Sequence, residues 1–338
     1  MKMPIIIAII LLVIGFLLAL GSLFMVRFDF RSFGAVQYEK REQTVTDSFT
    51  DIVIDADTFD VILAPVGEGG VRVEYDEPLK GKISLDVSVK DGKLCVTLKD
   101  DRKWYEKWTI FNFHSPTITV YLPEGDYGAL DVSLTTGDVL VTKGFSFASA
   151  TLELTTGDVD FNAAVSGAIT ATVTTGKLCF SGEAASLTLA GTANDVLLAD
   201  LTVAGAISVS VTTGDIEIKN GTAAEVALSG TTGDIEVKNL IVSGNVRTKS
   251  TTGDVELARV LVGGHLEIKG GSTDVSLVDS DAGTIYVDVT TGSVTGKLLT
   301  DKQYLATTTT GSIRVPRTTG PLCEIHTTTG DIDFLGED

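Results

Sequence analysis

The chain has 338 residues, only 7% of them aromatic, and carries a formal net charge of −19, with 26 basic against 45 acidic residues. This balance argues against nucleic acid as a partner, because neutralising phosphates requires a basic surface. It also argues against broad electrostatic docking on an anionic membrane surface. The 35 glycines, together with frequent Val, Ile, Thr and Asp, favour all-β structure.

The first 26 residues predict a transmembrane helix that acts as a signal-anchor. Pro4 to Val26 contains no charged residue, and at about 1.5 Å per helical residue this run spans roughly 35 Å, enough to cross a bilayer. The alternative is a cleaved signal peptide, since Ala19-Leu20-Gly21 has the small-x-small form that a signal peptidase accepts. The apolar run continues past that site, which favours the uncleaved helix.

Charges around this segment give two conflicting signals about orientation. Lys2 precedes it, whereas several basic residues such as Arg27 and Arg31 follow it, so the positive-inside rule would keep the remaining chain in the cytoplasm. However, a very short tail before an apolar run is how a signal-anchor begins, and long domains translocate largely regardless of charge. We therefore expect a single-pass protein of the cell membrane with an extracytoplasmic body, joined through a juxtamembrane connector at residues 27–48.

Residues 49–130 carry alternating patterns that are less regular than those that follow. Val71 to Tyr75 and Lys93 to Leu98 alternate apolar and polar positions, as half-buried strands do. Phe59-Asp60-Val61 is a near-copy of the corner that recurs later in the chain. We predict that this region forms the first, irregular coils of a repeat fold.

Residues 101–115 stand apart because they hold both tryptophans and much of the aromatic content. One hypothesis is an interaction platform, since aromatic faces stack on sugars and anchor interfaces. The alternative is a hydrophobic lid that covers exposed strand edges. The candidate platform residues are Trp104, Tyr105, Trp108, Phe111 and Phe113.

From residue 131 to 338, a TTGD phrase followed by Val or Ile recurs with a period of about 19 residues, which is typical of a stacked repeat architecture. Most copies place aspartate directly after the turn and an aliphatic residue after that. Thr273 also occupies the turn position. The other members of this turn column are Gly137, Gly157, Gly176, Asn194, Gly214, Gly233, Gly253, Gly292, Gly311 and Gly330.

Both sides of the turn alternate apolar and polar positions, as in Ile216-Glu217-Ile218, which indicates strands with one buried face. Two strands and two corners in about 19 residues cannot close a core alone, but parallel stacking buries the aliphatic column of each copy against its neighbours. The sequence therefore predicts an all-β fold. It is a parallel β-helix, or β-solenoid, with coils of about 19–20 residues, preceded by the N-terminal transmembrane helix.

The turn residues fit this prediction. Glycine supplies a left-handed backbone conformation without steric cost, and Asn194 is the substitute that best tolerates it. Thr273 does not fit, so we predict a different turn there. The aspartate that follows the turn is expected to bond nearby backbone amides.

These TTGD corners, with the β-rich region before them and the segment ITVYLP at Ile118 to Pro123, resemble the DUF4097 family. Its members are bacterial proteins labelled putative adhesins, and the resemblance implies a β-solenoid over residues 49–338. It also implies a membrane-anchored member, because relatives with one N-terminal membrane helix are implicated in envelope-stress operons. The family has no established catalytic or binding residues, so none is carried over.

The aspartate column raises the question of Ca²⁺, which Gly-Asp turns bind in some other β-rolls. A single carboxylate per coil places successive ligands about 4.8 Å apart in a line, which favours a structural role at the turn. We therefore predict no catalytic residue, no cofactor and no metal site, with Ca²⁺ as the alternative. Cys95, Cys179 and Cys323 are too far apart for a zinc site and are interpreted as small, half-buried hydrophobic residues.

These features predict a non-enzymatic, adhesin-like or scaffold protein of the bacterial cell envelope, with a role in the envelope stress response. Its expected partners are the membrane and either a protein or an envelope polymer, and its solenoid ends offer strand edges for self-association. One alternative is a lyase or hydrolase acting on wall or matrix glycans, although the tight coils after Leu130 leave no long loops for an active site. The other is a signalling scaffold on the cytoplasmic side.

Overall fold

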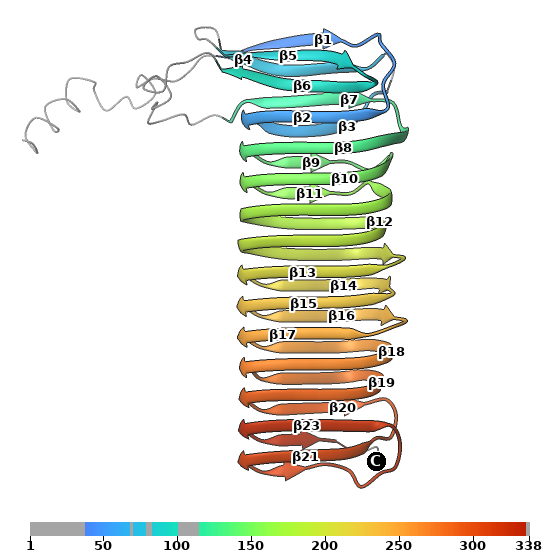
Figure 1. Ribbon diagram of the computed structural model, residues 1–338, viewed down its shortest axis with the longest axis vertical. Coiled ribbons are helices and arrows are strands. Elements are labelled where there is room, and N and C mark those ends of the chain that lie inside the picture. The colour runs from blue at the N-terminus through green and yellow to red at the C-terminus, as the bar shows by residue number, and fades with distance from the viewer. Residues whose placement is uncertain (1–37, 68–69, 79–82, 101–114, 336–338) are drawn as a thin grey trace, which may run out of the picture.

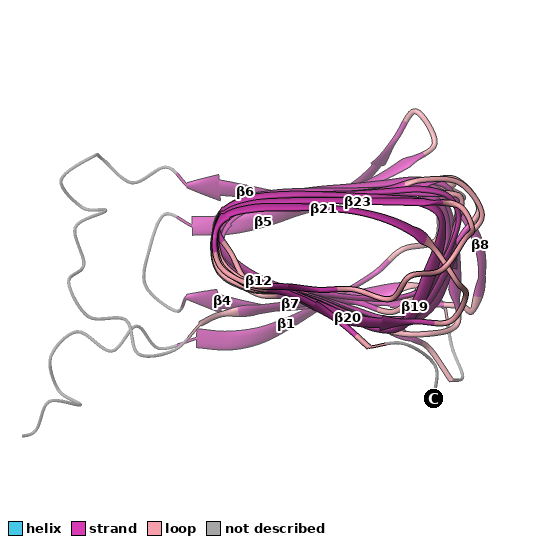
Figure 2. Cartoon of the chain, turned by 90° about the horizontal axis from the view of Figure 1, so that it is seen from below, coloured by secondary structure: helices cyan, strands magenta, loops and turns pink. Residues whose placement is uncertain are grey.

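The computed structural model describes residues 38–67, 70–78, 83–100 and 115–335, which form one long stack of β-coils (Figure 1). Viewed along the stack, each coil is a flattened ring whose two long faces enclose the core (Figure 2). The transmembrane helix predicted for residues 1–26 and the first half of the connector, residues 27–37, lie outside the described residues. Within those residues, no helix is long and apolar enough to cross a bilayer.

Each regular coil places one strand on each face. The first face, before the turn column, contains β2 (Asp51–Thr58), β8 (Gly125–Thr136), β10 (Phe145–Thr156), β13 (Ala206–Thr213), β15 (Glu225–Thr232), β17 (Val246–Thr252), β21 (Gln303–Thr310) and β23 (Leu322–Thr329). The second face contains β3 (Asp60–Pro65), β9 (Val139–Val141), β11 (Val159–Phe161), β14 (Ile216–Ala223), β16 (Ile235–Val242), β20 (Val294–Leu298), β22 (Ile313–Arg314) and β24 (Ile332–Phe334). Three long strands run round corners and serve both faces: β12 (Ala164–Val203), β18 (Val255–Ser272) and β19 (Val275–Thr291). The N-terminal end adds β1 (Tyr38–Thr44), β4 (Arg72–Pro78), β5 (Ile83–Lys90), β6 (Lys93–Asp100) and β7 (Thr117–Leu122).

Regular coils pair in parallel, in a register that keeps each repeat position over its counterpart. Val209 pairs with Leu228 on the first face, and Ile216 pairs with Ile235 on the second. The inward positions form one continuous hydrophobic core along the stack. The predicted parallel β-solenoid is therefore confirmed for the described residues.

Glycines of the turn column meet two steric demands at once. Their φ angles lie at positive values that other residues rarely adopt, such as 126° at Gly233 and 150° at Gly157. Each also lies directly against the backbone of an adjacent coil, so that a Cβ atom on Gly233 would fall 2.2 Å from the carbonyl oxygen of Gly214. Only glycine satisfies both the backbone angle and the close approach.

Asn194 and Thr273 occupy the same column by a different arrangement. Neither has a positive φ, so the expected left-handed turn at Asn194 is wrong, whereas Thr273 forms a different turn as predicted. Both side chains are buried, and the residue three positions earlier is glycine in each case. A Cβ on Gly191 would lie 1.8 Å from Asn194 Oδ1, and one on Gly270 would lie 2.7 Å from Thr273 Cβ. The corner side chain thus fills the space that an inward Leu or Val fills in many other coils.

The true left-handed column lies at the end of the second face, six residues after the turn position, and the sequence analysis missed it. Its members have φ between 48° and 56°, where Asn and Asp are the best tolerated side chains after glycine. The recurrence of Asp or Asn at this position was the available signal. The column comprises Asp200, Asn220, Asn239, Arg259 and Asp279.

The N-terminal end differs from the irregular coils expected for residues 49–130. Strands β2 and β3 form one coil, stacked on β8 and β9, and β6 and β7 extend the two faces in parallel. Beyond them, β5 pairs antiparallel with β6, while β4 pairs antiparallel with β7 and β1. The reversal at β5–β6 follows from Asp91-Gly92, whose φ angles of 50° and 74° suit a tight hairpin turn.

At the opposite end, the last two coils are stacked in the reverse of their sequence order. Strand β23 lies between β19 and β21, and β24 lies between β20 and β22. The regular repeat spacing had indicated a sequential order. Burial differs accordingly: β23 and β24 point Ile325 and Phe334 fully into the core, whereas the inward residues of β21, Tyr304, Ala306 and Thr308, are only partly buried. Gly296 leaves room for this arrangement, since a Cβ there would lie 2.7 Å from the Phe334 ring.

A buried ion pair holds the segment that crosses to the end of the stack. Lys302 is only 2% exposed, and its Nζ donates to Asp281 Oδ1 at 2.6 Å and to the Ala282 carbonyl oxygen at 2.7 Å. Thr318 Oγ1 donates to the Lys302 carbonyl oxygen at 2.7 Å. Loss of one partner of such a pair leaves a buried charge uncompensated, so these contacts fix the path of the crossing segment.

The corner exchange predicts strong coupling between Gly191 and Asn194. Gly191→Val alone should destabilise the protein by about 1–3 kcal/mol, because the new side chain overlaps Asn194. Asn194→Gly alone should cost a similar amount, because it opens a space and removes the Asn194 Nδ2 bond to the Gly176 carbonyl. The double variant reproduces the arrangement of Val173 and Gly176 and should recover to within about 1 kcal/mol of the parent. Denaturant unfolding measures this cycle, and strictly additive losses would contradict it.

Candidate interaction surfaces

The aspartate after each turn forms a hydrogen-bonded ladder along one edge of the stack. The carboxylate Oδ1 of one coil accepts the backbone amide of the equivalent residue in the next coil, as Asp215 does from Asp234 at 2.8 Å and Asp234 does from Asp254 at 2.8 Å. Asp138 bonds to Asp60 in the same way at 3.0 Å, so the early near-copy of the corner belongs to this ladder. The predicted bonding to backbone amides occurs, but between coils.

This geometry shows what the aspartate ladder does with its charge. One oxygen of each bonded carboxylate accepts a hydrogen bond from an amide. The ladder is interrupted at Lys177, which has no carboxylate to accept the amide of the next coil, and it resumes at Asp195. Within the described part of the chain, no group of three or more His, Cys, Asp or Glu side chains is placed to hold a metal ion. The ladder thus acts on the backbone of adjacent coils.

A parallel row of glutamates runs along the outer side of the second face. Glu217 and Glu236 form ion pairs with Lys219 and Lys238 on the same strands. The hydrogen bond from Lys238 holds the pKa of Glu236 below its ordinary value. Together with the aspartate ladder, this row lines a shallow depression of about 370 Å³. The depression is acidic but partly neutralised by its lysines.

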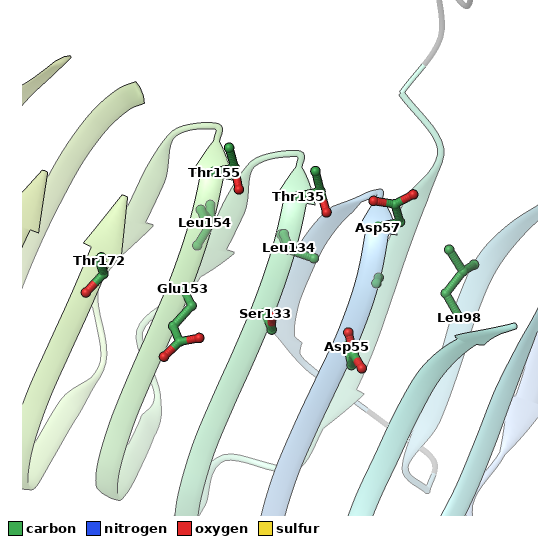
Figure 3. A pocket seen from close by; sticks show the side chains of 11 residues that line it. Asp55, Asp57, Leu98, Ser133, Leu134, Thr135, Glu153, Leu154, Thr155 and Thr172 are labelled. Carbon is green, nitrogen blue, oxygen red and sulfur yellow. The ribbon is translucent and has the colours of Figure 1, made fainter. Parts of the chain in front are cut away.

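The first face carries a groove of about 640 Å³, here called the hydroxyl–acid groove (Figure 3). Its polar side chains alternate with buried residues along β2, β8, β10 and β12, and therefore point outward. Adjacent strands place Asp55 beside Ser133, Ser133 beside Glu153, and Glu153 beside Thr172. The polar lining consists of Asp55, Asp57, Ser133, Thr135, Glu153, Thr155 and Thr172.

The groove exists because β6 separates from β2. These strands pair only as far as Asp55 and Thr97, although β6 continues to Asp100. Leu98 therefore lies across a gap from the polar side chains of β2 and β8, as Figure 3 shows. The groove is thus a junction between the regular coils and the N-terminal strands, and the repeat pattern gave no signal for it.

The groove offers hydrogen-bonding oxygens from hydroxyl and carboxylate side chains. Asp55 and Glu153 lie on strands separated by β8, so their backbones are roughly 10 Å apart, and no Lys, Arg or His is among the described residues that line the groove. Burial raises the pKa of the Cys323 thiol to about 12, which disfavours thiolate chemistry at that residue. Rows of hydroxyl and carboxylate oxygens suit contacts with a polymer rich in hydroxyl or amino groups.

The predicted aromatic platform of Trp104, Tyr105, Trp108, Phe111 and Phe113 lies outside the described residues. The glycines of the turn column lie along one corner of the stack, where they allow the close approach of adjacent backbones.

The structure adds a second side-chain ladder, at the left-handed column. Asn220 Nδ2 donates to Asp200 Oδ1 at 3.1 Å, and Asn239 Nδ2 donates to Asn220 Oδ1 at 2.9 Å.

Hydrogen-bonded carboxylates predict a specific acid response. The Ala129 amide lowers the pKa of Asp51, and the Ser312 amide and hydroxyl lower that of Asp331. A lowered folded-state pKa stabilises the fold above the unfolded value near 4, and this contribution is lost as pH falls through the folded-state pKa. Asp51→Asn with Asp331→Asn should therefore show a smaller drop in thermal midpoint between pH 6 and pH 3 than the parent. Asp126→Asn removes an exposed carboxylate as a control, and an equal drop in all three proteins would contradict the prediction.

Several solved structures have limited similarity to this chain. No curated protein matches the chain. A solved structure described as a putative adhesin from Parabacteroides distasonis is 15% identical, with 89% of this chain and 98% of that chain covered and a TM-score of 0.44. Another putative adhesin, from Parabacteroides merdae, is 15% identical, with coverage of 89% and 97% and a TM-score of 0.42. A putative lipid binding protein from Parabacteroides distasonis is 13% identical, with coverage of 89% and 97% and a TM-score of 0.39.

The family model named Toastrack DUF4097 matches residues 49–260 and 222–335. These ranges include the coil formed by β2 and β3, the hydroxyl–acid groove, the aspartate ladder and both reversed coils at the end of the stack. They exclude the region of the predicted membrane helix. The chain therefore belongs to the DUF4097 (Toastrack) family.

Proposed function

We propose that this protein is a membrane-tethered, adhesin-like rod that contacts components of the bacterial cell envelope through its outer surfaces. The observation that carries the proposal is the hydroxyl–acid groove, an open polar strip on a continuously stacked scaffold. A solenoid whose regular coils are held by parallel pairing presents such a strip without a deep pocket, which suits contact with a polymer or another surface. Family membership agrees with an adhesin-like solenoid.

The tether is proposed from the sequence. The uncharged run from Pro4 to Val26 is long enough for a bilayer, and β1, the first described strand, lies at the opposite end of the stack from β21 (Figure 1). An anchor before β1 would therefore hold one end near the membrane and direct the other away from it. Envelope stress is the setting in which we place this role, by analogy with anchored relatives.

The net charge of the chain limits the classes of polymer that it can bind. At a net charge of −19, strongly anionic polymers are repelled, whereas hydroxyl-rich or amine-bearing polymers are tolerated. The groove supplies acceptors and donors for such groups through Asp55, Ser133 and Glu153. We propose no enzymatic activity, because the groove is an open strip and not a pocket that would enclose a substrate. Release of reducing ends or unsaturated sugars from wall glycans would instead support the lyase or hydrolase alternative.

The first experiment tests on which side of the membrane the rod lies. A cleavable tag placed after Asp338 should be removed by protease added to intact spheroplasts, because the proposed topology exposes the rod outside the membrane. A cytoplasmic protein monitored in the same sample should survive. Immunoblotting of the tag and of this control gives the result.

A tag that is protected until detergent is added would overturn the adhesin-like role. The same outcome would support the cytoplasmic signalling scaffold, whose partners would then be sought inside the cell. If the tag is cleaved, isolated wall material becomes the appropriate bait for binding to the purified full chain.

A further inference from the structure

The far end of the stack carries a coil that is paired on one side only. Among the described residues, β21 pairs with β23 and β22 pairs with β24, and neither has a second partner. We call this coil, residues 303–320, the tip coil. Regular coils inside the stack are paired on both sides, so the tip coil presents an open edge.

The edge strands at the two ends of the stack differ in the charge of their side chains. The outer N-terminal strand β1 has the sequence YEKREQT, in which charged side chains discourage further strand addition. Strand β21 has the sequence QYLATTTT, with no charge and many β-branched residues. Leu305 is 52% exposed and Ile313 is 45% exposed on this coil. The tip coil therefore has the features of a strand that accepts another strand.

Backbone direction identifies the groups that are available for pairing. The Gln303 amide donates to the Pro321 carbonyl oxygen at 3.0 Å, toward β23. Since successive residues of a strand direct their amides to opposite sides, the amides and carbonyls of Tyr304, Ala306 and Thr308 point toward the open edge. These alternate backbone groups form a regular row of donors and acceptors.

We propose that the tip coil pairs with the tip coil of a second copy of this chain, end to end and antiparallel. A twofold axis normal to both faces brings β21 against its counterpart and continues the stack from one copy into the other. Charge favours this geometry, because the acidic rows of two chains of charge −19 stay farthest apart when the rods meet at their ends. The tip coil itself contains no acidic residue, and its Arg314 lies 3.3 Å from Asp333 of the adjacent coil.

The size of the contact indicates a weak association. An eight-residue strand is roughly 26 Å long, and a coil end about 20 Å across would bury about 500 Å² on each copy. The total of about 1,000 Å² is near the lower limit for a specific interface. Joining rods from facing membranes in this way rests on the proposed function, whereas the pairing itself does not.

Light scattering on the full chain in detergent micelles, at about 10 to 200 μM, tests the pairing. The parent should pass from monomer to dimer over this range. Ala306→Pro should weaken dimerisation by about tenfold or more, because proline removes an amide at the open edge and leaves the bonds to β23 in place. Ile241→Lys, which changes a residue that is 55% exposed on the side of the stack, should dimerise like the parent.

A parent that stays monomeric at about 200 μM, or an Ala306→Pro variant that dimerises as the parent does, overturns the proposal. If Ala306→Pro lowers the thermal midpoint, the double variant Leu305→Lys, Thr307→Lys decides instead, because both side chains are exposed and add charge to the edge. Dimerisation of that variant at parental strength also overturns the proposal. The spheroplast experiment is independent, so failure of tip pairing and failure of the outward topology give different results.

Discussion

The structure depends on one steric constraint, the direct superposition of each corner on the corner before it. A Cβ at Gly233 or Gly253 would lie about 2 Å from a carbonyl oxygen of the preceding coil, so the backbones approach as closely as glycine allows. This contact fixes the register of both faces at once, because a shift of one residue would turn the inward aliphatic column outward. The repeat period of about 19 residues in the sequence follows from that constraint.

Superposition also determines the surface. Any side chain placed outside one coil has its equivalent directly above and below it, so acidic residues accumulate in rows. The structure compensates in two ways: backbone amides bond to the aspartate ladder, and lysines such as Lys219 and Lys238 pair with the glutamate row. What results is a long surface with repeated chemistry, and the hydroxyl–acid groove lies where the stacking becomes irregular.

Ends are the unavoidable problem of a stacked fold, because identical coils always leave an edge. At the N-terminal end of the stack, the outermost strands pair antiparallel and carry charged side chains. Two of them are joined by a tight turn at Asp91-Gly92. At the other end the later coil, whose Ile325 and Phe334 are fully buried, lies inside the stack, and the earlier coil, whose inward residues are only partly buried, lies outside it. Lys302, bonded to Asp281 and the Ala282 carbonyl, secures the crossing that this reversal requires.

The sequence by itself determined the class of fold, the turn column and the inward aliphatic positions, because parallel stacking requires the same turn residue and the same inward aliphatic residues in every coil. It also indicated the aspartate ladder, although only the structure showed that each carboxylate bonds to the next coil. Local pattern could not reveal the exchange of Gly191 with Asn194, the gap between β2 and β6, or the reversed last coils. Those features depend on which side chain occupies a given space in the core and on which coil buries more apolar surface. Both are determined only when segments distant in the sequence pack together.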